Sequence, residues 1–186
     1  MRRLAALIIV PIVLALFAHP ATAATPDAAG VAAATARARP VRLAIKTITL
    51  DRPVLSVGLD KRRIPVVPNH DIGWYNLSAG PGEGENIVFW GHVLRFRTAP
   101  KKPAPFARLK ELEPGAVITL TDQTGKKYRY VVTDQIWATP DQVQYILPQG
   151  KEMLTLVSCI GDKVIVGKEV VEMTNRLITI AVPETP

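Results

Sequence analysis

Three side chains able to do chemistry stand beside apolar, strand-like segments of this sequence: His92, Cys159 and Arg176. Cys159 is the only cysteine, so it cannot form an internal disulfide and is either a small buried hydrophobe or a nucleophile. A nucleophilic cysteine needs a base or a cation to supply its thiolate, and histidine is the usual partner. An arginine can hold an oxyanion that develops on a substrate. Together, these residue types could carry out covalent catalysis with cysteine as the nucleophile.

Each of these side chains also has an ordinary structural explanation. Free cysteine is among the most buried residue types, so a lone cysteine is more often inert than reactive. His92 alone fits a histidine satisfied at a strand end, and Arg176 alone fits a surface arginine that opens a strand. His70 is the competing histidine, but its setting is turn-like, and we expect it to be solvated. No nucleophile elbow or acid–base partner supports a reactive Ser78 or Ser158.

The elements that must position this set are predicted to be buried β-strands. Met153–Ser158 is an apolar strand that ends on Cys159, and Asn86–Trp90 is a second strand that stops at Gly91-His92. A last strand at Arg176–Val182 opens on the arginine. An apolar strand places the polar residue at its end accurately, and functional sites are commonly built there. We therefore treat these three strand ends as one candidate site.

The rest of the chain after residue 40 predicts further short strands and two short helices. Residues 64–68 are extended but flanked by prolines, and strands are expected at 41–50, 53–57, 116–120, 128–132 and 164–171. Helices are expected at 103–112 and, with Thr139 as N-cap, at 139–146. Eight or so strands with turns between them predict a mainly β fold, a closed eight-stranded barrel with one or two short helices.

The first 40 residues do not have the pattern of a folded domain. Residues 1–24 combine two arginines, an apolar run at 4–18 and a small-x-small triplet at 21–23, which together predict a secretory signal peptide. If it is not cleaved, the same segment would serve as a membrane anchor, and the sequence leaves that choice open. Residues 25–40 are alanine-rich and predict a linker, and residues 41–186 form one domain-sized unit.

The charge balance argues against one broad class of partner. The 186 residues carry a formal charge of +7, but from Val41 onward 19 Lys and Arg stand against 15 Asp and Glu, a net charge of +4. This mild balance, without a basic stripe interleaved with aromatic residues, argues against nucleic acid. No Cys/His cluster suggests zinc.

The candidate residues also carry a resemblance to a known family. Thr155-Leu-Val-Ser-Cys159 resembles the TLxTC motif of the sortases, the cysteine transpeptidases of bacterial cell surfaces. Gly91-His92, 67 residues before the cysteine, resembles the sortase histidine, and Arg176, 17 residues after it, resembles the sortase arginine. The segment Phe106-Ala-Arg-Leu109 is similar to the short helix that follows the histidine in this family. The resemblance covers about residues 41–182 and implies a sortase-like barrel as the catalytic domain.

The resemblance implies a mechanism and a set of partners. Cys159 would attack the threonine carbonyl of an LPxTG- or LAxTG-type C-terminal sorting signal, and His92 would protonate the leaving amine. Arg176 would position the substrate and stabilise the oxyanion, and Thr155, Val157 and Ser158 would bind the substrate. Partners would be surface proteins with a sorting signal and an amine acceptor of the cell wall or a pilin. The enzyme would be exported, with membrane contact through residues 1–24 if they are uncleaved.

Two departures from the family pattern concern specificity and class. Ser158 replaces the threonine before the cysteine, but its hydroxyl is kept, and Ile160-Gly-Asp162 replaces the family's aromatic-proline continuation. The glycine-rich approach to His92 is closest to class E and class F. No cofactor is expected: loop carboxylates that could bind calcium, as in some sortases, show no spaced ligand loop and are read as solvated surface acids. These carboxylates are Glu83, Glu85, Asp134 and Asp141.

Two rival functions are separated from this hypothesis by simple observations. The L,D-type cysteine transpeptidases place a His-Gly pair just before the cysteine, whereas Val157-Ser158 stands there in this sequence. The second rival is a non-catalytic exported β-barrel that binds cell wall or partner proteins, with Cys159 buried. The reactivity of the thiol in the folded protein discriminates between catalysis and this binding module.

Overall fold

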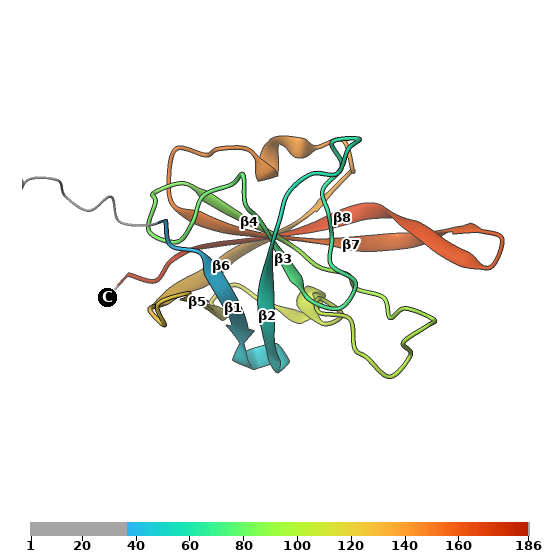
Figure 1. The fold of residues 1–186 in the computed structure, drawn as a ribbon, viewed down its shortest axis with the longest axis horizontal. Coiled ribbons are helices and arrows are strands. Elements are labelled where there is room, and N and C mark those ends of the chain that lie inside the picture. Colours follow the sequence, from blue (N-terminus) through green and yellow to red (C-terminus); the bar gives the residue numbers. More distant parts are fainter. Residues whose placement is uncertain (1–36, 186) are drawn as a thin grey trace, which may run out of the picture. The chain divides into compact units, whose positions relative to one another are not determined.

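The computed structural model describes residues 37–185, so the predicted signal or anchor at 1–24 and most of the predicted linker at 25–40 lie outside the described residues. Eight strands close into a barrel in the order β1-β2-β3-β4-β7-β8-β6-β5 (Figure 1). The strands are β1 (Pro40–Ile45), β2 (Leu50–Val57), β3 (Ile72–Tyr75), β4 (Asn86–Trp90), β5 (Val117–Asp122), β6 (Lys127–Ala138), β7 (Met153–Val166) and β8 (Glu169–Pro183). The predicted mainly β, closed eight-stranded barrel is confirmed.

The hydrophobic core fills the interior of this barrel. Alternate side chains of a strand point to opposite faces, and on β7 the even-numbered Leu154 and Leu156 point inward and are fully buried. Leu43 of β1 and Leu120 of β5 meet them in the same core. Phe106, which follows β4 in a long loop, also belongs to this core and is 1% exposed. The loop after the candidate histidine is therefore anchored by core packing.

The two predicted helices are much shorter in the structure. Within residues 37–185 the helical elements are three short 3-10 helices, η2 (Lys46–Ile48), η3 (Leu109–Glu111) and η4 (Val143–Ile146). Phe106, Leu109 and Leu112 are buried as predicted, but their spacing of three residues matches the period of a 3-10 helix, and prolines precede it. The N-cap of η4 is Gln142. Thr139 was therefore wrongly predicted as a cap, and its backbone N–H donates to Gln142 Oε1 at 2.7 Å.

Near the start of the barrel, one predicted strand is interrupted. The alternation over residues 41–50 predicted a single strand, but η2 separates β1 from β2, and Thr49 adopts a left-handed φ of 55°. The prediction of strand 53–57 was too short, because β2 begins at Leu50. The extended segment 64–68 forms only an isolated bridge, between Pro65 and Leu59, as expected for a segment flanked by prolines.

The last two strands form a long ribbon, where the sequence pattern predicted three shorter strands. Cys159 does not end its strand, because β7 continues to Val166, and Arg176 does not open one, because β8 begins at Glu169. The strand predicted at 164–171 is instead the end of this hairpin, whose turn contains Gly167 at a φ of 64°. Figure 1 shows the ribbon, in orange to red, extending past the other strands. Cys159 and Arg176 therefore lie in the middle of the ribbon.

Candidate active site

Strand pairing brings His92 to the level of Cys159. β4 and β7 run parallel, with Trp90 opposite Val157, and the Gly91 N–H donates to the Val157 carbonyl at 3.3 Å. His92 lies two residues after Trp90, and Cys159 lies two residues after Val157. Because the two strands run in the same direction, continuing this register places the His92 and Cys159 side chains at the same edge of the sheet.

A second pairing adds Arg176 to the same place. β7 and β8 are antiparallel, and Cys159 lies directly opposite Arg176 in their register. His92, Cys159 and Arg176 together line a cavity of about 250 Å³, which Val157 and Ser158 also line. The segment around η4 contributes Thr139, Val143 and Ile146 to the same cavity. The three residues singled out from the sequence are therefore brought together around one concave surface.

His92 is half-buried, and its surroundings favour the neutral imidazole. Burial lowers its pKa below the ordinary value, a hydrogen bond to the Val67 backbone partly offsets this, and the nearby His70 lowers it further. The ring also meets the Phe96 ring edge-on, at 5.0 Å between centroids and 87° between planes. These contacts fix the position of the ring beside the cavity.

His70, expected to be solvated, is instead half-buried close to His92. Its ring meets Phe96 edge-on at 5.4 Å, so one phenyl ring contacts both histidines. The sequence carries no local signal for this arrangement, because His70 precedes β3, whereas His92 and Phe96 lie in the loop after β4, and only the fold brings the two segments together.

Cys159 is half-buried, and the neutral thiol is favoured in the resting structure. Burial raises the pKa of the thiol, the Arg176 guanidinium acts in the opposite direction, and the Glu172 carboxylate raises the pKa further. Arg176 is the only group among these causes that favours the thiolate.

Arg176 is held at the rim of the site by a carboxylate that sequence reasoning missed. Its Nη2 lies 2.6 Å from Glu172 Oε1, and its Nη1 donates to the carbonyls of Met173 at 3.0 Å and Asn175 at 3.2 Å. Residues i and i+4 of a strand point to the same face, so strand parity permits the Glu172–Arg176 pair. The prediction that the strand begins at Arg176 concealed that signal.

Thr155 and Val157 precede the cysteine but have different surroundings. Val157 is half-buried and lines the cavity. Thr155 is fully buried, and its hydroxyl donates to Asn86 Oδ1 at 2.8 Å. The Asn86 amide in turn donates to the carbonyls of Tyr145 at 2.9 Å and Leu147 at 3.0 Å. Thr155 therefore supports the loop before β7 from inside, and Asn86 is a second residue that the sequence did not single out.

The carboxylates considered for calcium are not clustered. Glu85 accepts hydrogen bonds from the backbone N–H groups of Asn86, Gln149 and Gly150, and Glu83 accepts from Gly80. Between residues 37 and 185, no group of three or more His, Cys, Asp or Glu side chains is placed to hold a metal ion. In the same part of the chain, no helix is long and apolar enough to cross a membrane.

Comparison with known proteins gives consistent matches. The family model described as the sortase domain matches residues 43–184. Sortase A of Bacillus anthracis is 29% identical over 142 residues, which cover 74% of this chain and 61% of that protein. The chain thus spans about three fifths of the length of the curated relative that it matches.

Solved structures share the fold. Sortase A from Corynebacterium diphtheriae, as a lid mutant, gives a TM-score of 0.60 at 23% identity and covers 80% of this chain and 72% of its own. Sortase C1 from Streptococcus agalactiae gives a TM-score of 0.58 at 23% identity and covers 78% of this chain and 67% of its own. Sortase C-1 from Actinomyces oris gives a TM-score of 0.59 at 20% identity and covers 79% of this chain and 75% of its own.

Proposed function

We propose that this chain, which belongs to the sortase family, is an extracytoplasmic cysteine transpeptidase that cleaves an LPxTG- or LAxTG-type sorting signal after threonine. The acyl group would then be joined to an amine of the cell wall or of another surface protein. The observation that carries the proposal is the meeting of His92, Cys159 and Arg176 around one cavity through two independent strand pairings. These residue types supply a nucleophile, a proton carrier and an oxyanion partner.

In the proposed reaction, the Cys159 thiolate attacks the threonine carbonyl carbon and forms a tetrahedral intermediate. The Arg176 guanidinium stabilises its oxyanion, the C–N bond breaks, and the leaving amine takes a proton from His92. An acceptor amine then attacks the thioester and transfers its proton to His92, and the thiolate leaves. Overall, one amide bond is exchanged for another.

The two perturbed pKa values bear on how much of the enzyme is ready to react. The pKa of Cys159 is raised and that of His92 is lowered, so thiol and imidazole are both mainly neutral near pH 7. The thiolate–imidazolium form is then a minor fraction, and the Arg176 guanidinium is the neighbouring group that favours the thiolate. The small size of this fraction limits the rate of acylation.

Val157 and Ser158 are proposed to contact the sorting signal, because both line the cavity that holds the three reactive side chains. Thr155 would act indirectly, since its contact with Asn86 holds the loop that contributes the opposite wall. Class E or class F remains our prediction for the subclass, and export through residues 1–24 remains our prediction for localisation. The alternative of a non-catalytic wall- or protein-binding barrel with a buried cysteine is less favoured, because Cys159 is only partly buried.

The full-length protein should be incubated with a panel of sorting-signal peptides and an amine, with cleavage and amide product measured by chromatography. Wild type should cleave at least one peptide after threonine. His92→Ala and Arg176→Ala should each lower kcat/KM by about 100-fold or more. Arg129→Ala is a matched control, because Arg129 pairs with Glu184 elsewhere on the barrel, and it should retain activity. No cleavage of any peptide by wild type would contradict the proposal.

A further inference from the structure

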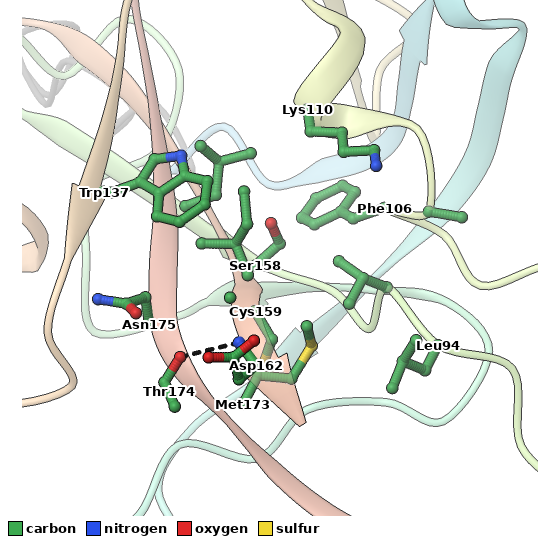
Figure 2. A pocket seen from close by; sticks show the side chains of 15 residues that line it. Leu94, Phe106, Lys110, Trp137, Ser158, Cys159, Asp162, Met173, Thr174 and Asn175 are labelled. Atoms are coloured by element: carbon green, nitrogen blue, oxygen red, sulfur yellow. Dashed lines mark hydrogen bonds between the residues drawn. The ribbon is translucent and has the colours of Figure 1, made fainter. Parts of the chain in front are cut away.

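A second cavity, of about 550 Å³, borders Cys159 without being lined by His92 or Arg176. Figure 2 shows side chains that surround it from four parts of the fold. They are Phe106 and Lys110 near η3, Trp137 of β6, Ser158 of β7, and Asp162 and Asn175 of the β7–β8 ribbon. We call this cavity the mouth pocket. The proposed donor chemistry at His92 and Arg176 does not use it.

The mouth pocket contains a buried polar group without a partner. Ser158 is 3% exposed, and its hydroxyl makes no hydrogen bond within the described residues. Buried hydroxyls are normally hydrogen-bonded, and an unmade bond carries a desolvation cost. In Figure 2 the Ser158 side chain lies between Phe106 and Trp137, but its oxygen has almost no accessible surface. Recognition of a molecule in this pocket therefore falls to the exposed side chains around it.

Two aromatic side chains form the apolar part of the pocket. Phe106 belongs to the core, whereas Trp137 is 62% exposed although it lies on a barrel strand. A large exposed tryptophan beside a concave surface is a typical anchor for a bound peptide, because it buries much area at little entropic cost.

Charged side chains of opposite sign complete the pocket. Lys110 and Asp162 are both exposed, and in Figure 2 they lie on opposite sides of the pocket. The ion pairs found among residues 37–185 involve neither of them. Asp162 lies on β7, the strand that carries Cys159, whereas Lys110 lies on η3, so the negative end of the pocket is the end on the strand of the nucleophile. The pocket thus complements a molecule with an ammonium group at one end and a carboxylate at the other.

We propose that the mouth pocket binds the acceptor of the transpeptidation, and that the acceptor is a peptide with both a free amino group and a carboxylate. This inference rests on the proposed function. Asp162 pairs with the ammonium group near Cys159, Lys110 pairs with the carboxylate, and Trp137 covers the peptide between them. The ammonium first loses one proton to solvent. The neutral amine then attacks the thioester carbonyl and passes a second proton to His92 as the new C–N bond forms, and the C–S bond breaks to release the Cys159 thiolate.

The path from the pocket to the thioester is short. Val93, Leu94 and Met173 line both the mouth pocket and an adjacent cavity of about 450 Å³ that contains His92, Cys159 and Arg176. A chain in the mouth pocket therefore needs to pass only these apolar side chains to present its amine to the acylated cysteine. The donor peptide would occupy the smaller cavity between His92 and the η4 segment.

The test uses three acceptor probes and measures two steps separately. The probes are triglycine, triglycine amide, which lacks the carboxylate, and N-acetyltriglycine, which lacks the amine. Asp162→Asn should raise KM for triglycine about fivefold, the size expected for an exposed charge pair, while the rate of acyl-enzyme formation stays within about twofold. Lys110→Gln should raise KM for triglycine but not for triglycine amide. A purely structural role of Lys110 would not produce that difference.

Two control variants change charged side chains that do not line the mouth pocket. Lys102→Gln and Asp141→Asn remove the same charges from exposed positions outside the pocket and should leave all KM values unchanged.

If the acyl-enzyme forms normally but neither pocket variant changes KM, the acceptor pocket is wrong and the proposed function stands. If no acyl-enzyme forms, the proposed function fails, and binding is tested directly in the Cys159→Ala protein. There, triglycine must shift the amide resonances of Lys110 and Asp162 but not those of the controls, and unshifted pocket resonances overturn the inference.

Discussion

At the scale of single residues, Glu172 is the group that most changes the view of the site. It holds the Arg176 guanidinium at 2.6 Å while its own charge opposes ionisation of the neighbouring thiol. Arg176 favours the thiolate, so the two members of one ion pair act on Cys159 in opposite directions. The carboxylate therefore limits the reactivity of the free enzyme.

Replacing Glu172 with glutamine should make Cys159 more reactive. The substitution removes a negative charge that raises the thiol pKa, so the pKa falls and a larger thiolate fraction is present at neutral pH. The measurement is the rate of alkylation by iodoacetamide as a function of pH, whose midpoint should move to lower pH. Glu169→Gln is the control, because Glu169 lies on the same ribbon but pairs with Arg97 at 3.1 Å. A midpoint that stays in place or rises in Glu172→Gln would contradict this account.

The sequence predicted which three side chains meet at the cavity better than it predicted their neighbours. His92, Cys159 and Arg176 were recognisable because each follows or joins an apolar strand, and the family resemblance links them. Their neighbour His70 depends on contacts between separate loops through Phe96, and such contacts leave no periodic pattern.

At the scale of elements, the junction between β4 and the following loop depends on Gly91. A Cβ atom built on Gly91 would lie 2.7 Å from Phe106 Cδ2 and 2.9 Å from its Cγ. Phe106 is 1% exposed, and its N–H donates to the His92 carbonyl at 2.9 Å. The absence of a side chain at Gly91 thus lets a core ring pack directly beneath the candidate histidine.

Gly91→Ala should therefore destabilise the protein by about 1–3 kcal/mol, the usual cost of overpacking a core. Urea unfolding followed by circular dichroism measures the change. At Gly58 the nearest atom to an added Cβ is Asn76 Oδ1 at 3.5 Å, an ordinary contact, so Gly58→Ala should stay within about 0.5 kcal/mol of wild type. Equal stability of the two variants would show that Phe106 moves aside without cost.

The ends of strands and helices were the features least predictable from the sequence. The strand Met153–Ser158 was predicted to end on Cys159, but the β7–β8 ribbon continues because each strand supplies the backbone partners of the other. Its far half exposes Ile165 and Val166 at 59% and 64%, so hydrophobicity does not mark where it ends. The length of the helix predicted at 103–112 was overestimated. Apolar residues three apart fit both an α-helix and a 3-10 helix, and the prolines before Phe106 favour the shorter 3-10 form.

At the scale of the whole molecule, closure of the barrel creates the site. The strands that hold the reactive residues are paired across long sequence separations, β4 with β7 in parallel and β7 with β8 antiparallel. Strand patterns alone predicted a barrel but not which strands pair, because pairing depends on the packing of the complete core. The short β3, which the pattern did not predict, completes the barrel between β2 and β4.

The central claim is that this barrel forms a covalent thioester with a sorting signal at Cys159. Its most direct test is the intact mass of the full-length protein after incubation with an LPxTG- or LAxTG-type peptide and an acid quench, followed by peptide mapping. We predict an added mass equal to the peptide up to threonine, located on Cys159, absent from Cys159→Ala and removed by added triglycine. Cleavage of the peptide by Cys159→Ala, or turnover by wild type without any adduct on Cys159, would contradict the account.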